Sequence, residues 1–240
     1  MSRTNPVLVL VHGAWHGPDV WDRLAAQLSE FDVVRVALPS AGPDTSALGG
    51  LDDDSAAVSA AISSVDPERD VVVVAHSYGG VPVTAAVDQP NVRGIVFVAA
   101  WIVDVGQSLV DVAGGPDNVP DWWDVHPEGG YVDALRGAEV FYNDMEAADA
   151  ASHVETLTHN SLAVGFQPLE RAAWRTTPST YVVCDRDASL PPAFQLEMAG
   201  SLPRVLHLDS GHSPFLSRPS ELADIVRDEA RIFAEGIRTD

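Results

Sequence analysis

The chain has 240 residues, of which 46% are hydrophobic, and a formal net charge of −21 at pH 7. A chain of this length and composition can bury a full core, so we expect one folded domain and no extensive disorder. The acidic balance argues against nucleic acid and anionic membrane surfaces as partners, because both are bound through clustered Lys and Arg.

All 14 basic residues are arginine, which excludes Schiff-base and lysine-base chemistry. The single cysteine, Cys184, cannot form an intramolecular disulfide, and we expect it to be a buried, unreactive thiol. The apolar run before His12 is too short for a signal peptide, and no run reaches the roughly 18 residues of a membrane span. We therefore expect a soluble, cytoplasmic protein, and the sequence leaves open whether it is a monomer or a homodimer.

Short β-branched runs recur along the chain. They are continuous rather than alternating, as in strands of a parallel sheet whose two faces are covered by helices. Amphipathic stretches typical of helices lie between them, which predicts an α/β fold with a doubly wound, mostly parallel six-stranded sheet. The runs occupy residues 7–11, 32–38, 70–75, 92–100, 179–184 and 204–208.

One long segment interrupts this alternation. Almost eighty residues without a good strand pattern separate the fourth run from the fifth, and they include the helix-like stretch 137–157. Connections of that length usually have structure or function of their own. We interpret residues 104–176 as an inserted helical cap, and residues 1–103 together with 177–240 as the core.

The third run ends in "AHSYGG", residues 75–80, and ligands of doubly wound sheets bind beyond such strand ends. The stretch is a variant of the nucleophile elbow G-x-S-x-G, in which Ala75 stands in place of the first glycine. The strand before it and the helix expected after it are the context that this motif requires. Ser77 is therefore the candidate nucleophile.

"AHSYGG", the loop "HGAWHG" after the first run, and "DRDASLPP" and "SGHSPF" after the last two runs together resemble the α/β-hydrolase family. The resemblance implies a catalytic Ser-His-Asp set without cofactor or metal. His212 stands where the family carries its catalytic histidine. His76 is expected to point away from Ser77, and His12 and His16 to hold the shape of the first loop.

The family's acid follows the strand that precedes the histidine strand, shortly before a proline, and this favours Asp187. Asp185 and Asp104 are the alternatives. By the same resemblance, the oxyanion that forms during acyl transfer is bound by the backbone N–H groups of Ala14 and Tyr78.

The pairing of "HGAWHG" with "HSYGG", and a cap before the acid, resembles the subgroup of methyl esterases, hydroxynitrile lyases and small bacterial esterases. The lyases carry a threonine and a lysine where this chain has Gly13 and Ser213. Without that cation a leaving cyanide has no evident stabiliser, so ester hydrolysis is favoured over lyase activity. Ser77 argues against dehalogenases and epoxide hydrolases, which use an aspartate at the elbow.

The function that this resemblance implies is hydrolysis of a small, largely apolar carboxylic ester. A biosynthetic cyclase or thioesterase and a non-catalytic receptor on the same scaffold are the alternatives. We expect an apolar substrate pocket, and so acidic a protein suits neutral substrates. The aromatic residues expected to line it are Trp15, Trp122, Trp123, Phe141 and Tyr142.

Overall fold

The computed structural model describes residues 5–236. Its main element is a six-stranded sheet in which all neighbouring strands are parallel. The predicted α/β fold is thus confirmed, and the six β-branched runs supply the six strands. In spatial order these are β10 (Arg204–Leu208), β9 (Ser179–Cys184), β5 (Val92–Val98), β4 (Val71–His76), β1 (Val7–Val11) and β2 (Val33–Val36).

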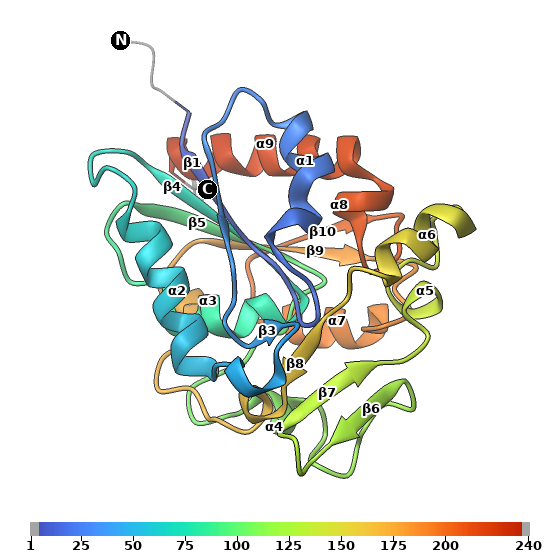
Figure 1. The fold of residues 1–240 in the computed structure, drawn as a ribbon. Coiled ribbons are helices and arrows are strands. Elements are labelled where there is room, and N and C mark those ends of the chain that lie inside the picture. Colours follow the sequence, from blue (N-terminus) through green and yellow to red (C-terminus); the bar gives the residue numbers. More distant parts are fainter. Residues whose placement is uncertain (1–4, 237–240) are drawn as a thin grey trace.

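Helices cover both faces of this sheet, as Figure 1 shows. Strands β1, β4 and β9 are buried along their whole length, which explains why their sequences are continuously apolar. One face carries α1 (Asp22–Gln27), α8 (Pro214–Ser217) and α9 (Pro219–Glu235). The other face carries α2 (Leu51–Ser63), α3 (Gly80–Ala86) and α7 (Pro192–Ala199).

The segment 104–176 contains helices, as expected, and also three strands that the sequence reading missed. The helices are short: α4 (Leu109–Val112), α5 (Gly137–Val140) and α6 (Ala147–Val154). The strands form an antiparallel sheet with β3, in the order β3 (Ala41–Gly42), β8 (His159–Ser161), β7 (Tyr131–Ala134) and β6 (Trp123–His126). "Helical" is therefore an incomplete description of this segment.

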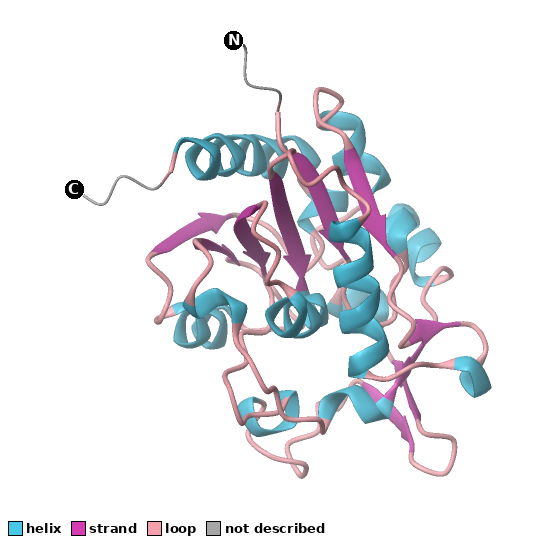
Figure 2. Ribbon diagram, turned by 90° about the vertical axis from the view of Figure 1, so that its left-hand side faces the viewer, coloured by secondary structure: helices cyan, strands magenta, loops and turns pink. Residues whose placement is uncertain are grey.

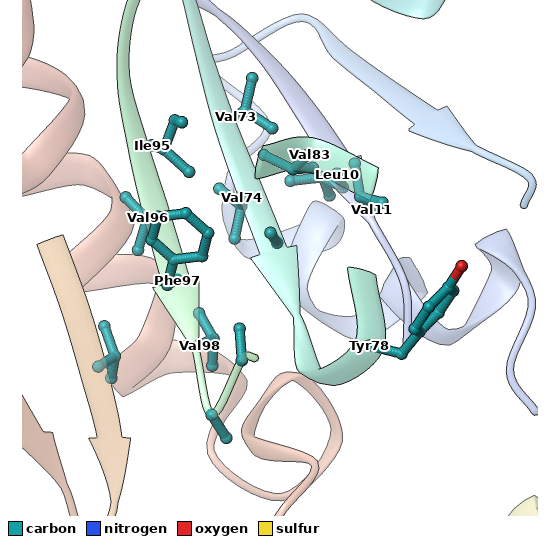
Figure 3. Close-up of a cluster of buried hydrophobic side chains, with 14 of the residues drawn as sticks. Leu10, Val11, Val73, Val74, Tyr78, Val83, Ile95, Val96, Phe97 and Val98 are labelled. Carbon is teal, nitrogen blue, oxygen red and sulfur yellow. The ribbon is translucent and has the colours of Figure 1, made fainter. Parts of the chain in front are cut away.

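The small sheet lies at the end of the molecule toward which the central parallel strands point (Figure 2). The hydrophobic core is formed by the parallel strands and the inner faces of the helices, and Figure 3 shows part of it around β4 and β5. The loops that leave the carboxyl ends of the parallel strands therefore lie on the side of the core that faces the small sheet. Among residues 5–236, no helix is both long and apolar enough to cross a membrane.

Candidate active site

The turn after β4 places Ser77 at the carboxyl end of the sheet. Ser77 has a left-handed backbone conformation with φ of 51°, which is unfavourable for a residue with a side chain and recurs at functional sites. A short 3-10 helix, Ser77–Gly79, begins here and leads directly into α3. Ser77 is therefore the residue at which the strand turns sharply into the helix.

The two glycines after Ser77 allow the backbone segments to pass close together. A Cβ on Gly79 would lie 2.5 Å from the carbonyl oxygen of His12, and one on Gly80 would lie 2.3 Å from that of Trp101. The backbone N–H of Trp101 in turn donates a hydrogen bond of 3.0 Å to the carbonyl of Ser77. Both positions need glycine for steric reasons, because a side chain would push the elbow away from the loops that surround it.

His212 lies in the loop after β10 and is only 1% exposed. Its Nδ1 donates a hydrogen bond of 2.7 Å to Oδ2 of Asp187, which lies in the loop after β9. A carboxylate on Nδ1 selects the tautomer whose Nε2 is free to accept a proton. The pair thus has the arrangement of a general base oriented by a buried acid.

Asp187 is held by four hydrogen-bond donors. Oδ1 accepts from the backbone N–H groups of Ser189 and Leu190, each at 2.8 Å. Oδ2 accepts from His212 and, at 2.9 Å, from the side-chain amide of Gln195. Because these donors fix both oxygens, the carboxylate remains pointed at His212.

The two alternative acids lie elsewhere. Asp185 accepts a hydrogen bond of 2.7 Å from Nδ1 of His207, and Asp104 accepts one of 2.7 Å from Nε of Arg175. Of the three aspartates considered from the sequence, Asp187 is the one that the structure brings to His212.

Ser77 and His212 are close to a shared neighbour, His76. Nε2 of His76 donates to the backbone carbonyl of His212 at 2.9 Å, and the two rings lie 4.6 Å apart. Within residues 5–236 the hydroxyl of Ser77 forms no hydrogen bond, and the residue is 9% exposed. Nucleophile–base contacts are often loose in unliganded enzymes and tighten when substrate binds.

The loop after β1 lies against Ser77. A Cβ on Gly13 would come within 2.8 Å of Cβ of Ser77, so only glycine allows this approach. The next residue is Ala14. Its backbone N–H and that of Tyr78 form no hydrogen bond with the described residues, so both donors are unused beside Ser77.

His12 and His16 hold this loop, as the sequence suggested. Nδ1 of His12 donates to the carbonyl of Gly13 at 2.8 Å, while its Nε2 accepts from the N–H of Leu38 at 3.1 Å. Nδ1 of His16 donates to the carbonyl of Ala14 at 2.7 Å. Burial lowers the pKa of His12 to about 4 and that of His16 to about 3, so both are neutral near pH 7.

The aromatic residues expected to line a pocket form one cluster beside His212. The ring of Trp15 lies 5.5 Å from Trp122, 5.7 Å from Trp123 and 5.6 Å from Phe141. Phe141 lies 5.7 Å from the ring of His212. Tyr142 is buried, and its hydroxyl donates to Nε2 of His16 at 2.9 Å.

Three further features of the described part of the chain bear on the site. Residues 5–236 hold no cluster of three or more His, Cys, Asp or Glu side chains that could bind a metal ion. Cys184 is buried, and burial raises the pKa of its thiol, so it is unreactive. Two surface hollows of about 320 Å³ flank the small sheet, and neither is lined by Ser77 or His212.

The sequence profile of the alpha/beta hydrolase family matches residues 8–225. The chain belongs to this family. It is 30% identical over 259 residues to Methylesterase 7 of Arabidopsis thaliana, covering 94% of this chain and 96% of the relative. It is 28% identical over 244 residues to an alpha/beta hydrolase of Aspergillus novofumigatus, covering 94% of this chain and 96% of that relative. Among relatives of the family, methylesterases recur, so this hydrolase falls in the methylesterase-like subgroup.

Solved structures share the same fold. A pyrethroid hydrolase from Sphingobium faniae superposes with a TM-score of 0.80 at 20% identity, covering 96% of this chain and 99% of that one. Polyneuridine aldehyde esterase superposes with a TM-score of 0.78 at 23% identity, covering 94% of this chain and 99% of that one. These likenesses show the alpha/beta hydrolase fold over 94–96% of the chain.

Sequence reasoning about this hydrolase missed several residues that contact the site. Gln195 holds Asp187, and its Oε1 accepts from the N–H of Cys184 at 3.0 Å. Asp54 bonds the hydroxyl of Tyr78, and Asn160 bonds the N–H of Trp15. None belongs to a motif, and a buried polar residue cannot be told from a surface one by its letter alone, so no sequence signal pointed to them.

Proposed function

We propose that this hydrolase cleaves a carboxylic ester by acyl transfer to Ser77. Oγ of Ser77 attacks the ester carbonyl while Nε2 of His212 takes its proton, and Asp187 stabilises the resulting imidazolium. His212 then gives this proton to the leaving alcohol. Water, activated by the same histidine, attacks the acyl-serine and releases the carboxylic acid, so no cofactor is needed.

The buried contact between His212 and Asp187 is the observation that carries the proposal. A buried carboxylate is stable only when several hydrogen-bond donors compensate for the lost water. Four donors bind the two oxygens of Asp187, and one of these donors is the imidazole of His212. The strained turn at Ser77 supports the role of this residue as nucleophile.

The unused N–H groups of Ala14 and Tyr78 support an oxyanion hole. They lie on the two loops that meet at Ser77, where negative charge develops on the carbonyl oxygen of the substrate. Loss of one such donor costs about 10²–10³ in rate, which is comparable to the contribution of a well-placed base.

The aromatic cluster beside His212 supports a small, largely apolar ester as the substrate. Phe141 faces His212, and Trp15 and Trp122 pack against Phe141. The names of the methylesterase relatives favour the same bond type. We treat residues 104–176 as the cap of this site and 1–103 with 177–240 as the core, since Phe141 and Tyr142 reach His212 and His16 from that segment.

The proposal is tested with a fluorophosphonate probe and a panel of short and long aryl esters. We expect the wild type to be labelled and to hydrolyse at least one ester, and Ser77→Ala to do neither. Ser55→Ala is the matched control, because it removes a hydroxyl on α2 that has no hydrogen-bond partner among residues 5–236. It should behave as the wild type does.

Equal labelling or equal turnover by wild type and Ser77→Ala would overturn the serine mechanism. Labelling of Ser77 without turnover of any ester would contradict ester hydrolysis and favour a binding or biosynthetic role. Cleavage of mandelonitrile is measured separately, as an assay of hydroxynitrile lyase activity. Cleavage of mandelonitrile without turnover of any ester would contradict the inference, drawn from Gly13 and Ser213, that ester hydrolysis is favoured over lyase activity.

A further inference from the structure

Asp54 is a fully buried carboxylate. It lies in the first turn of α2 and is 0% exposed. Its Oδ1 accepts from the backbone N–H of Ser40 at 2.9 Å, and its Oδ2 accepts from the hydroxyl of Tyr78 at 2.6 Å. Among residues 5–236 no arginine or histidine pairs with it. Such a group is costly to bury, which calls for an explanation beyond packing.

One contact of Asp54 leads to the elbow. Tyr78 directly follows Ser77, and its own backbone N–H is one of the two proposed oxyanion donors. The side chain is 3% exposed and lies at the end of the elbow turn, apart from Phe97 and Val98 of β5 (Figure 3). Burial and the neighbouring carboxylate raise the pKa of Tyr78, so the phenol stays protonated and its O–H donates a hydrogen bond to Asp54.

The other contact leads to the loop after β1. The carbonyl of Ser40 accepts from the N–H of Ser161 in β8 at 2.8 Å. The preceding residue, Asn160, accepts through Oδ1 from the N–H of Trp15 at 3.3 Å. Trp15 has φ of 62° and directly follows Ala14, the second proposed donor. A path of hydrogen bonds and short stretches of covalent backbone therefore joins the two donors through Asp54.

We propose that Asp54 is a positioning residue that sets the spacing of the two oxyanion donors, Ala14 and Tyr78. The inference rests on the proposed function, because it assigns those donors a shared task. Hydrogen bonds to a buried carboxylate are short and strong. They therefore hold the elbow and the β8 side of the first loop in one arrangement more firmly than apolar packing would.

Three variants test this role. Asp54→Ala removes both contacts, and Tyr78→Phe removes the hydroxyl while keeping the ring. Each should lower kcat on an aryl ester and the rate of Ser77 phosphonylation by about tenfold with little change in KM, because a donor displaced by a fraction of an ångström loses part of its effect. Asp54→Asn can accept from Ser40 and donate to Tyr78, so it should restore part of the rate.

The combination of the two changes separates a shared network from two independent defects. If Asp54 acts through the Tyr78 hydroxyl, the double variant should be no more than slightly slower than the slower of Asp54→Ala and Tyr78→Phe. Independent effects would multiply to about a hundredfold, by the additivity of unconnected sites.

Two controls distinguish positioning from general loss of structure. Val58→Ala makes a cavity on the buried face of the same helix, so it should lower the unfolding temperature and leave kcat unchanged. Asp52→Asn removes an exposed charge in the same turn and should change neither quantity. All rates are measured well below the unfolding temperature of the least stable variant.

The outcomes separate this inference from the proposed function. If wild-type Ser77 is not phosphonylated, both fail together. If wild type is phosphonylated and Asp54→Ala and Tyr78→Phe react at its rate, the positioning role is overturned while the serine mechanism stands. A rate loss in Val58→Ala equal to that in Asp54→Ala would also overturn it, because stability alone would then explain the effect.

Discussion

His76 donates a hydrogen bond of 2.9 Å from its Nε2 to the backbone carbonyl of His212, which is 136 positions away in the chain. The residue before the proposed nucleophile thus holds the backbone of the proposed base. Burial lowers the pKa of His76 well below its usual value, so the ring is neutral and serves as a fixed donor. The elbow and the loop after β10 are therefore coupled through one side chain.

Replacing His76 tests this coupling. His76→Leu removes the donor at similar volume and leaves the His212 carbonyl unpaired, so we expect kcat to fall about tenfold as His212 loses its position. His76→Gln retains an amide donor and should keep more of the activity. Steady-state kinetics on an aryl ester measures both, and equal activity of all three proteins would show that His76 does not position His212.

Gln195 is expected to matter through Asp187. In Gln195→Met the carboxylate loses one of its four donors, and the N–H of Cys184 loses its acceptor. Asp187 keeps its other three donors, but the Cys184 N–H is left unsatisfied at a cost of about 1–3 kcal/mol. The free energy of unfolding should therefore fall by at least about that amount, and kcat should fall as well. Chemical denaturation and kinetics are the measurements. Gln89→Met is the control, because Gln89 bonds Ser59 away from the site; an equal effect of the two changes would contradict this role.

The glycines of the elbow make a steric prediction. In Gly79→Ala the new methyl group meets the carbonyl oxygens of His12 and Val11, which are backbone atoms and cannot move aside. We expect a loss of about 3 kcal/mol in the free energy of unfolding, typical of overpacking. Gly17→Ala is the control, since no described residue beyond its chain neighbours lies within 4 Å of the added carbon there. Denaturation midpoints that fall equally for both variants would refute the close approach.

How far these features were predictable differs between the two sheets. The runs 7–11 and 179–184 coincide with β1 and β9, because burial on both faces leaves a continuous apolar signal. The run 92–100 extends beyond β5, which ends at Val98 because Ala99 has a left-handed φ of 42°. Strand β8 reads "HNS" and pairs with "AG" of β3. The extended conformation of β8 results from its pairing with β3 and β7, so its own sequence carries no β-branched or alternating pattern.

The candidate site shows the same division. Ser77, His212 and the loop around Ala14 follow strand ends, so topology alone brings them to one edge of the sheet. The family resemblance favoured Asp187 and kept Asp185 as an alternative, and the structure separates the two by their partners, His212 and His207. Asp54 lies in a run of three aspartates, of which it alone is buried. Which of the three is buried depends on which face of α2 is turned toward the sheet, and the amino-acid composition does not show this.

Protonation of His12 predicts a pH dependence of stability. The pKa of His12 falls from 6.5 in the unfolded chain to about 4, chiefly because burial disfavours the cation. Between pH 6.5 and 4 the unfolded chain binds more protons at this position than the folded protein does. The contribution of His12 to the free energy of unfolding is therefore fully present above pH 6.5 and is lost as the pH falls toward 4, by at most about 1.4 kcal/mol per pH unit. A proton on Nε2 would also face the N–H of Leu38, donor against donor.

The measurement is the free energy of unfolding of wild type and His12→Gln at several pH values from 7 to 4.5. Glutamine has no ionisable group, so the difference between wild type and variant should shrink as the pH falls. Parallel curves would contradict a neutral, buried His12. Groups elsewhere in the chain titrate equally in both proteins and cancel in the difference.

The most direct test of the serine mechanism locates the adduct of a fluorophosphonate on the protein. Cleavage after arginine releases residues 70–93, in which Ser77 is the one serine. Mass spectrometry of this peptide from wild type should show the phosphonyl group on Ser77, and Asp187→Asn should react far more slowly because its His212 loses the acceptor that selects its tautomer. A phosphonyl group on any other residue, or equal labelling of the Asp187→Asn variant, would contradict a nucleophile at Ser77 activated by His212 and Asp187.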